Sequence, residues 1–258
     1  MLKVCLNGGR SRRDHPAVPV TAAELAADAA RCVAAGADAV HLHPRGHDEA
    51  ETLDAAYVAA AVSAVRAACP GTPVGVTTGA WIAPDPAARV AAVRGWTTPP
   101  DFASVNAHEP GAEAVAAALH ELGVGVEAGL WTPDAVIAYR RWRVPVDRIL
   151  LECLPDGSAG AQPAPGLDGG ERRPDDPAVG QAEELLSALG VGAGGRDPAA
   201  PAVLLHAEGP GTWPVLRLAV RLGLHTRIGL EDTTELPDGS PAPDNAALVA
   251  AAVALGAG

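Results

Sequence analysis

Eight short apolar runs, separated by Ala-rich segments of helical periodicity, constrain the fold of this chain more than any other feature. The helical segments open with capping signals, and the first runs from the Thr21–Glu24 capping box to Gly36. Strict alternation of strand and helix implies parallel strands with right-handed crossovers. Eight such units in 258 residues predict an α/β fold, a (β/α)8 TIM barrel, with an open doubly wound sheet as the alternative. The expected strands cover residues 2–7, 37–43, 73–78, 102–106, 123–128, 148–153, 202–207 and 225–231.

No shift in composition divides the chain, so we expect one TIM-barrel catalytic domain over residues 1–258. One segment, residues 155–176, is rich in Pro, Gly and Asp and lacks periodic apolar positions. It is predicted to be a long loop after the sixth strand, either a lid over the site or a disordered insertion.

The charge of the chain narrows the class of partner. A formal net charge of −12 argues against binding to nucleic acid or to an anionic membrane surface, because both require clustered Lys and Arg. A small-molecule partner is expected instead. The N-terminus enters a strand without a secretion signal, and no apolar run approaches the ~20 residues that span a bilayer, which predicts a cytoplasmic protein. Four scattered cysteines are predicted to be buried thiols: Cys5, Cys32, Cys69 and Cys153.

Polar side chains collect at the carboxyl ends of the expected strands, which favours the barrel over the open sheet. In (β/α)8 barrels the chemistry lies at the carboxyl ends of several strands. Some of these residues are expected to fill interior layers or cap turns rather than act on a substrate. In strand order they are Asn7; His41 and His43; Thr77 and Thr78; Ser104, Asn106 and His108; Glu127; Glu152; His206 and Glu208; and Arg227, Glu231 and Asp232.

Two of these positions predict a metal site. His41 and His43 are two residues apart, so on a strand their imidazoles point to the same face and can bind one ion. Glu231, on the same face of the eighth strand as Arg227, is the natural third ligand, and two His with one carboxylate is a typical catalytic zinc set. The alternatives are two polar residues that merely end a strand, and a simple ion pair between Arg227 and Glu231.

Other residues suggest how a substrate is handled. Asp232, beside the expected ligand, is a candidate base, or else a cap for the segment that follows. Glu127 needs a cation, which could be Arg227, the metal or a substrate ammonium group. Thr77 and Asn106 can hold a carboxylate by hydrogen bonds. The arginines that follow the first strand could meet the phosphates of a CoA ester, or simply lie in a solvated loop.

Two motifs resemble the β-keto acid cleavage enzymes, and in particular the 3-keto-5-aminohexanoate cleavage enzyme type. They are His41-Leu42-His43-Pro44-Arg45 at the second strand and Arg227-Ile228-Gly229-Leu230-Glu231-Asp232 at the eighth. The resemblance implies a zinc-dependent retro-Claisen reaction, in which a β-keto acid and acetyl-CoA give acetoacetate and a new acyl-CoA, carried out by a homo-oligomer. By the same resemblance, the site residues are His41, His43 and Glu231 for zinc; Asp232, Arg227 and Glu127 for catalysis; and Thr77, Asn106, Ser104 and Arg45 for substrate binding.

Two other functions fit the same residues. A metal-dependent barrel hydrolase or aldolase could use the three ligands without CoA. A barrel that binds a small metabolite without catalysis is the alternative from another class.

Overall fold

The computed structural model of the protein describes residues 1–154, 176–191 and 200–258. The predicted loop 155–176 therefore lies outside the described residues, except for Asp176, which caps the following helix. The strands are β1 (Leu2–Cys5), β2 (Ala39–Leu42), β3 (Val74–Thr77), β4 (Phe102–Asn106), β5 (Gly125–Leu130), β6 (Arg148–Cys153), β7 (Ala202–Ala207) and β8 (Thr226–Ile228). The helices are α1 (Ala22–Ala34), α2 (Ala55–Ala68), α3 (Pro86–Arg94), α4 (Ala112–Glu121), α5 (Pro133–Tyr139), α6 (Pro177–Leu189), α7 (Thr212–Arg221) and α8 (Asn245–Ala254), with a short 3-10 turn η1 (Gly209–Gly211) before α7.

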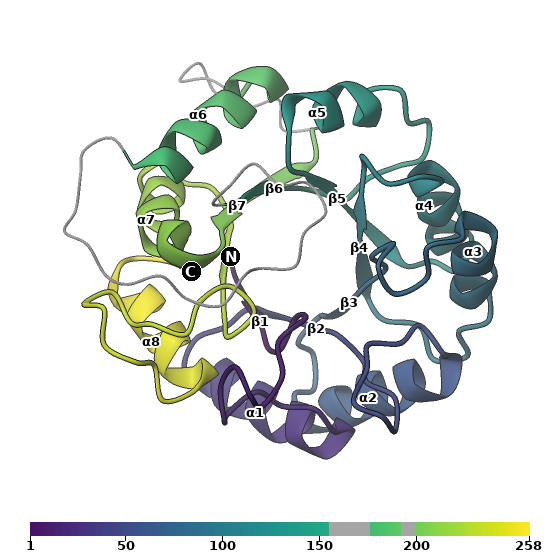
Figure 1. Ribbon diagram of the computed structural model, residues 1–258, viewed down its shortest axis with the longest axis horizontal. Coiled ribbons are helices and arrows are strands. Elements are labelled where there is room, and N and C mark those ends of the chain that lie inside the picture. The colour runs from purple at the N-terminus through teal and green to yellow at the C-terminus, as the bar shows by residue number, and fades with distance from the viewer. Residues whose placement is uncertain (155–175, 192–199) are drawn as a thin grey trace.

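The strands form a parallel ring with the helices outside it, so the predicted (β/α)8 barrel is confirmed (Figure 1). Strand order follows chain order, and β1 pairs with both β2 and β8. The ring closes between β7 and β8 through a bridge of Leu204 with His225 and a hydrogen bond from Leu205 N to His225 O of 2.9 Å. An open doubly wound sheet would leave these two strands apart.

The last strand is shorter than predicted and ends at Ile228 instead of residue 231. A Cβ atom on Gly229 would lie 1.9 Å from the carbonyl oxygen of Cys5, so only glycine allows the chains to approach this closely. Beyond it the backbone turns, with Asp232 N and Thr233 N both donating to Gly229 O. Glu231 and Asp232 are therefore held by a tight turn over the end of β1.

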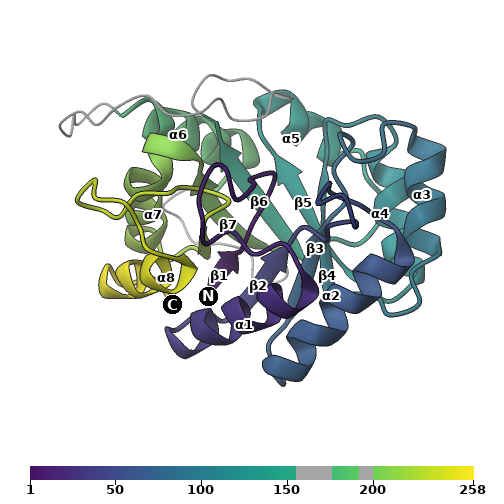
Figure 2. The same cartoon turned by 60° about the horizontal axis from the view of Figure 1, so that its bottom comes forward.

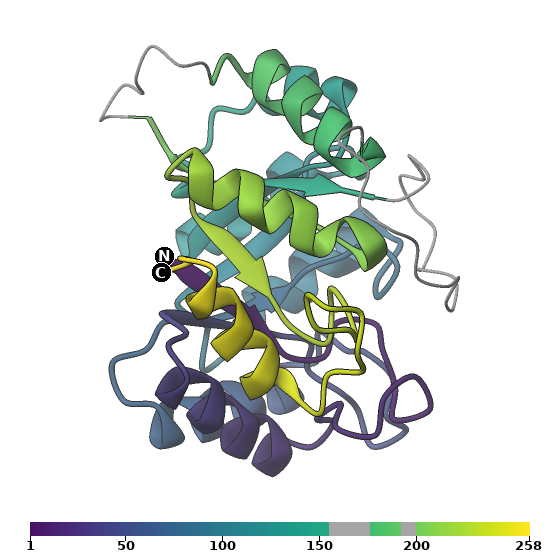
Figure 3. The same ribbon diagram turned by 90° about the vertical axis from the view of Figure 1, so that its left-hand side faces the viewer.

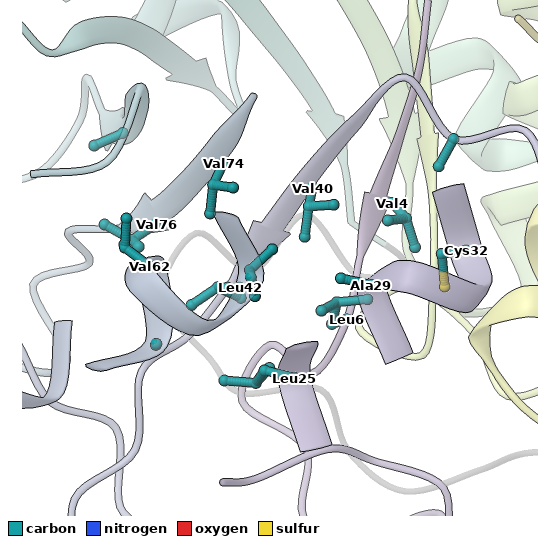
Figure 4. Close-up of a cluster of buried hydrophobic side chains, with 14 of the residues drawn as sticks. Val4, Leu6, Leu25, Ala29, Cys32, Val40, Leu42, Val62, Val74 and Val76 are labelled. Carbon is teal, nitrogen blue, oxygen red and sulfur yellow. The ribbon is translucent and has the colours of Figure 1, made fainter. Parts of the chain in front are cut away.

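The outward faces of the strands carry the apolar core that holds the helices in place. Alternate residues of β1, β2 and β3 point away from the barrel axis and pack against α1 and α2, as Figure 4 shows. Burying each such Val or Leu contributes about 1.5–3 kcal/mol relative to leaving it exposed. This cluster includes Val4, Val40, Leu42, Val74 and Val76 from the strands, Leu6 just after β1, and Leu25, Ala29, Cys32 and Val62 from the helices.

The loops that follow β1 and β8 meet over the carboxyl ends of the strands (Figure 2). The Arg10 Nε atom lies 3.4 Å from the carbonyl oxygen of Glu231, and His15 Nε2 lies 2.9 Å from Ala242 O. The two termini lie side by side at the opposite end of the barrel (Figure 3). Within the described residues, no helix has the length and apolar character needed to cross a membrane.

Candidate metal centre and active site

The structure brings the three predicted metal ligands together at the carboxyl end of the barrel. His41 and His43 project inward at the end of β2, and Glu231 reaches them from the turn after β8, across β1. One ligand atom from each residue lies within 4.8 Å of the others, and His43 Nε2 is 3.6 Å from Glu231 Oε2. All three are at least nine-tenths buried.

The donor set fits a divalent ion of the zinc type. His41 Nδ1 and Glu231 Oε2 are buried and have no hydrogen-bond partner among the described residues, which is costly unless a ligand satisfies them. Burial lowers the pKa of His41 well below its ordinary value, so its imidazole is neutral and able to coordinate. Burial alone would raise the pKa of Glu231, but the positive charge of Arg227 outweighs it and keeps the carboxylate ionised.

Glu51 holds His43 in the tautomer that a metal requires, and its role is not evident from the sequence. His43 Nδ1 donates a hydrogen bond of 2.5 Å to Glu51 Oε1, which leaves Nε2 free to face Glu231. The indole of Trp81 donates to the same carboxylate at 3.1 Å. Glu51 lies in the loop after β2, eight residues beyond His43, where no periodicity fixes its direction.

Asn7 fixes the backbone of His43. Its Oδ1 accepts from His43 N and its Nδ2 donates to His43 O, each at 2.9 Å. The same amide donates to Pro19 O at 3.1 Å, which ties the loop after β1 to the metal ligand. The predicted polar strand end at Asn7 is therefore a backbone clamp beside the site.

Arg227 links the candidate base to the third metal ligand. Its guanidinium contacts Asp232 Oδ1 at 2.8–2.9 Å through Nη2 and Nε, and Nη2 also lies 3.1 Å from Glu231 Oε1. Burial would raise the pKa of Asp232, but Arg227 and the neighbouring His206 lower it overall. Asp232 Oδ2 is buried and has no hydrogen-bond partner among the described residues. This oxygen is an unpaired acceptor beside Arg227, but Asp232 is fully buried and is not among the residues that line the cavity described below.

A second group of acids lies on the other side of the ring, on β6 and just after β7. His206 joins Asp232 to Glu152, with Nδ1 3.5 Å from Asp232 Oδ1 and Nε2 3.4 Å from Glu152 Oε2. Glu208 follows β7, and its Oε1 lies 3.8 Å from Arg227 Nη2. The sequence placed these acids at strand ends without assigning them a role.

Three of the four predicted substrate residues line a cavity of about 120 Å³ above the metal ligands. These are Thr77, Ser104 and Asn106. Asn106 Nδ2 donates to Glu109 Oε1 at 2.9 Å, so this acid orients the amide. The wall is completed by Gly9, Arg10, Trp81, Trp131, Leu150, Glu152, Leu154, Glu208, Arg227, His41, His43 and Glu231.

Arg45 is placed differently from the expectation of a direct substrate contact. It is not among the residues that line the cavity, and its guanidinium donates to the carbonyl oxygens of Gly8 and Arg10, the latter at 3.0 Å. It therefore holds the loop that brings Arg10 to the cavity.

Glu127 also departs from its expected environment, because it does not lie against Arg227. On β5 it stands in register with Arg148 of β6, with which it forms an ion pair, and Lys3 Nζ lies 2.5 Å from its other oxygen. These two cations outweigh the effect of burial and lower the pKa of Glu127. The negative charge of Glu127 is therefore balanced by two cations inside the barrel, and the residue does not line the cavity.

Fold and site together define a (β/α)8 barrel with a candidate metal centre at the carboxyl ends of its strands. The family model of the β-keto acid cleavage enzymes matches residues 1–138 and 180–257, which is most of the chain. The protein belongs to this family.

Individual relatives are more distant. The chain is 35% identical over 80 residues to 3-oxoadipate:acetyl-CoA acetyltransferase of Cupriavidus necator, a match that covers 31% of this chain and 28% of that protein. It is similar to ObcA solved without ligand, with 18% identity, a TM-score of 0.65, and coverage of 94% of this chain and 63% of ObcA. The ternary complex of ObcA with a C4-CoA adduct and oxalate gives 18% identity, a TM-score of 0.62, and coverage of 91% and 62%. The matched regions therefore span less than two thirds of these relatives, and the likeness to ObcA shows the fold.

Proposed function

We propose that the protein is a zinc-dependent enzyme that cleaves a β-keto acid with acetyl-CoA and releases acetoacetate and a new acyl-CoA. The observation that carries the proposal is the convergence of His41, His43 and Glu231 beside a buried, ionised Asp232 in a family member. A named relative is an acetyl-CoA acetyltransferase of a β-keto acid, and ObcA has been solved with a CoA adduct, which supports a thioester as the second substrate.

Zinc held by the three ligands would supply Lewis-acid stabilisation of the keto oxygen. Asp232 Oδ2 takes a proton from C2 of the β-keto acid, and Arg227 holds the opposite oxygen of Asp232 in place. Thr77 and Asn106 bind the substrate carboxylate from β3 and the end of β4.

The atoms balance without a further reactant. The C2 carbanion displaces CoA thiolate from acetyl-CoA, the thiolate adds to the original C3 carbonyl, and the C2–C3 bond breaks. The new acyl-CoA leaves, and the enolate of acetoacetate recovers the proton from Asp232. Glu127 makes no direct contact with the substrate in this scheme, because its carboxylate is held inside the barrel by Lys3 and Arg148.

The first test is metal content by elemental analysis of the protein and of His43→Ala, with exposed His47→Ala as a matched control. We expect about one zinc per chain, lost in His43→Ala and kept in His47→Ala. A protein that holds no metal and binds none on addition would refute the proposal.

Activity is then measured as acetoacetate released from a panel of β-keto acids with acetyl-CoA. The panel includes 3-keto-5-aminohexanoate, because the motifs around the metal resemble that type of enzyme. Turnover that needs no CoA would indicate the hydrolase or aldolase instead, and binding without turnover would indicate the non-catalytic barrel. The predicted homo-oligomer and cytoplasmic location are tested separately by light scattering and by cell fractionation.

A further inference from the structure

A buried acid–base pair beside the cavity has no part in the chemistry above. Glu109 lies in the loop after β4, and Arg89 lies on α3. Their side chains are 7% and 1% exposed, and neither is among the described residues that line the cavity. Removing two charged groups from water costs free energy, and the hydrogen bonds that these groups make show which parts of the site they hold.

One oxygen of Glu109 holds two parts of the cavity wall. Its Oε1 accepts from Asn106 Nδ2 at 2.9 Å and from the backbone N–H of Ala80 at 3.0 Å. Ala80 precedes Trp81, which lines the cavity and whose indole donates to Glu51. The same carboxylate therefore fixes the end of β4 and the loop after β3.

Arg89 holds this carboxylate from the other side. Its Nη1 lies 3.5 Å from Glu109 Oε2. The guanidinium also donates to the carbonyl oxygen of Ala83, in the loop after β3, and to that of Pro110, in the loop after β4. These loops lead into α3 and α4, which lie side by side outside the barrel (Figure 1). The ion pair therefore ties together two neighbouring strand ends.

The bond to Glu109 decides which end of the Asn106 amide is offered to a ligand. A carboxylate paired with an arginine only accepts, so Asn106 must turn its nitrogen toward it. Its Oδ1 is turned toward β5, where a Cβ atom on Gly129 would lie 2.4 Å from it. The amide nitrogen has two hydrogens, and Glu109 takes one of them. The second is a donor that Asn106 can offer to the cavity, which it lines.

We infer that Glu109 is a positioning residue for substrate binding: it orients Asn106 as a donor toward the substrate carboxylate, with Arg89 as its counter-charge. The inference rests on the proposed function, in which Asn106 binds that carboxylate. A flipped amide would present its oxygen to the carboxylate and repel it. Loss of Glu109 should therefore weaken binding of the keto acid, act mainly through Asn106, and leave the chemical step almost unchanged.

The test is a double-mutant cycle of Glu109→Ala and Asn106→Ala, measured by isothermal titration of the zinc-loaded protein with acetoacetate. Acetoacetate is the probe because the proposed reaction releases it from every substrate and because it carries the carboxylate. Glu109→Ala should raise its Kd about ten-fold, since the donor is no longer oriented. In the Asn106→Ala background the same substitution should raise Kd no more than about three-fold, the part that acts through the loop of Ala80. Equal losses in both backgrounds would overturn the inference.

The controls separate positioning from a merely structural role. Glu121→Ala is the matched control, because Glu121 pairs with Arg94 at the exposed end of the same two helices, and it should keep the wild-type Kd. If Glu109→Ala lowers the free energy of unfolding in urea and leaves Kd unchanged, the residue is only structural and the inference is wrong. Glu109→Gln keeps the size of the side chain and an oxygen for Asn106, so it should lose about three-fold, and it provides a second cycle if Glu109→Ala does not fold.

The Asn106 amide also gives a reading that needs no substrate. Its side-chain signals in a nitrogen–proton NMR spectrum are assigned by their loss in Asn106→Ala. One of the two hydrogens should exchange slowly with water in the wild type and rapidly in Glu109→Ala. If this protection is present but acetoacetate does not bind, the proposed function is refuted and the orientation of Asn106 is supported. Equal exchange rates in the two proteins would overturn the inference and leave the reaction standing.

Discussion

Removing the carboxylate of Glu51 should weaken metal binding although Glu51 touches no metal. Its Oε1 accepts the 2.5 Å hydrogen bond from His43 Nδ1 in a setting where the two side chains are 9% and 6% exposed. A hydrogen bond to a charged group contributes about 1.5–3 kcal/mol. The loss of about 2 kcal/mol in Glu51→Ala corresponds to a roughly thirty-fold weaker Kd for zinc, since about 1.4 kcal/mol is ten-fold.

Glu51→Gln is expected to be milder, at about ten-fold, because an amide oxygen can still accept from His43 without the charge. The measurement is competition for zinc with a chromophoric chelator at constant pH. Glu49→Gln is the matched control, since Glu49 lies in the same loop, is exposed and loses the same charge. If Glu51→Ala binds zinc as tightly as the wild type while His43→Ala does not bind it, Glu51 does not orient the ligand.

Three further predictions concern catalysis and stability. Asp232→Asn should retain zinc but lose about 10²–10⁴-fold in kcat, because the general base is gone; a loss of zinc in the same variant would instead assign Asp232 to the metal site. Asn245→Ala should lower the free energy of unfolding in urea by about 3 kcal/mol, because its buried amide bonds the backbone of Leu6 and Leu230 and the carboxylate of Asp28, and a loss below 1 kcal/mol would contradict this role. Burial raises the pKa of Asp28 in the folded protein. The protonated side chain therefore stabilises the fold fully below the unfolded pKa of about 4, and this stabilisation is lost as the pH rises through the higher folded pKa. The free energy of unfolding should therefore fall less between pH 4 and 7 in Asp28→Asn than in the wild type, as measured by urea titration at each pH, and equal slopes would contradict the expectation.

The fold, and the grouping of the three proposed metal ligands, could be predicted because both follow from periodicity. Apolar runs alternating with Ala-rich segments determine the ring, and the spacing of His41 and His43 by two residues places both imidazoles on its inner face. Glu231 could be added because its strand neighbours β1, which in turn neighbours β2. Each step depends only on strand geometry.

The surroundings of these ligands could not be predicted, because they depend on loops and on register. Glu51 reaches His43 from an irregular loop, and no pattern in the sequence fixes that path. Glu127 was expected to meet a cation, but the choice among cations depends on which residue stands opposite on the neighbouring strand, and that residue is Arg148. Arg45 carries the charge expected of a substrate ligand, yet its length allows it to hold the backbone of Gly8 and Arg10.

The position of the metal ligands on either side of β1 has a consequence for how the ring stays closed. The seam between β7 and β8 is held by a single bridge and the hydrogen bonds beside it, whereas β8 pairs over three residues with β1. An ion bound by His41, His43 and Glu231, as proposed, would join the second strand to the turn after the last one and so connect the beginning of the barrel to its end. If the proposed metal binds there, the terminal strand–helix unit could detach from the ring only after the ion had lost one of its three protein ligands, so metal binding would also oppose local unfolding of the C-terminal unit.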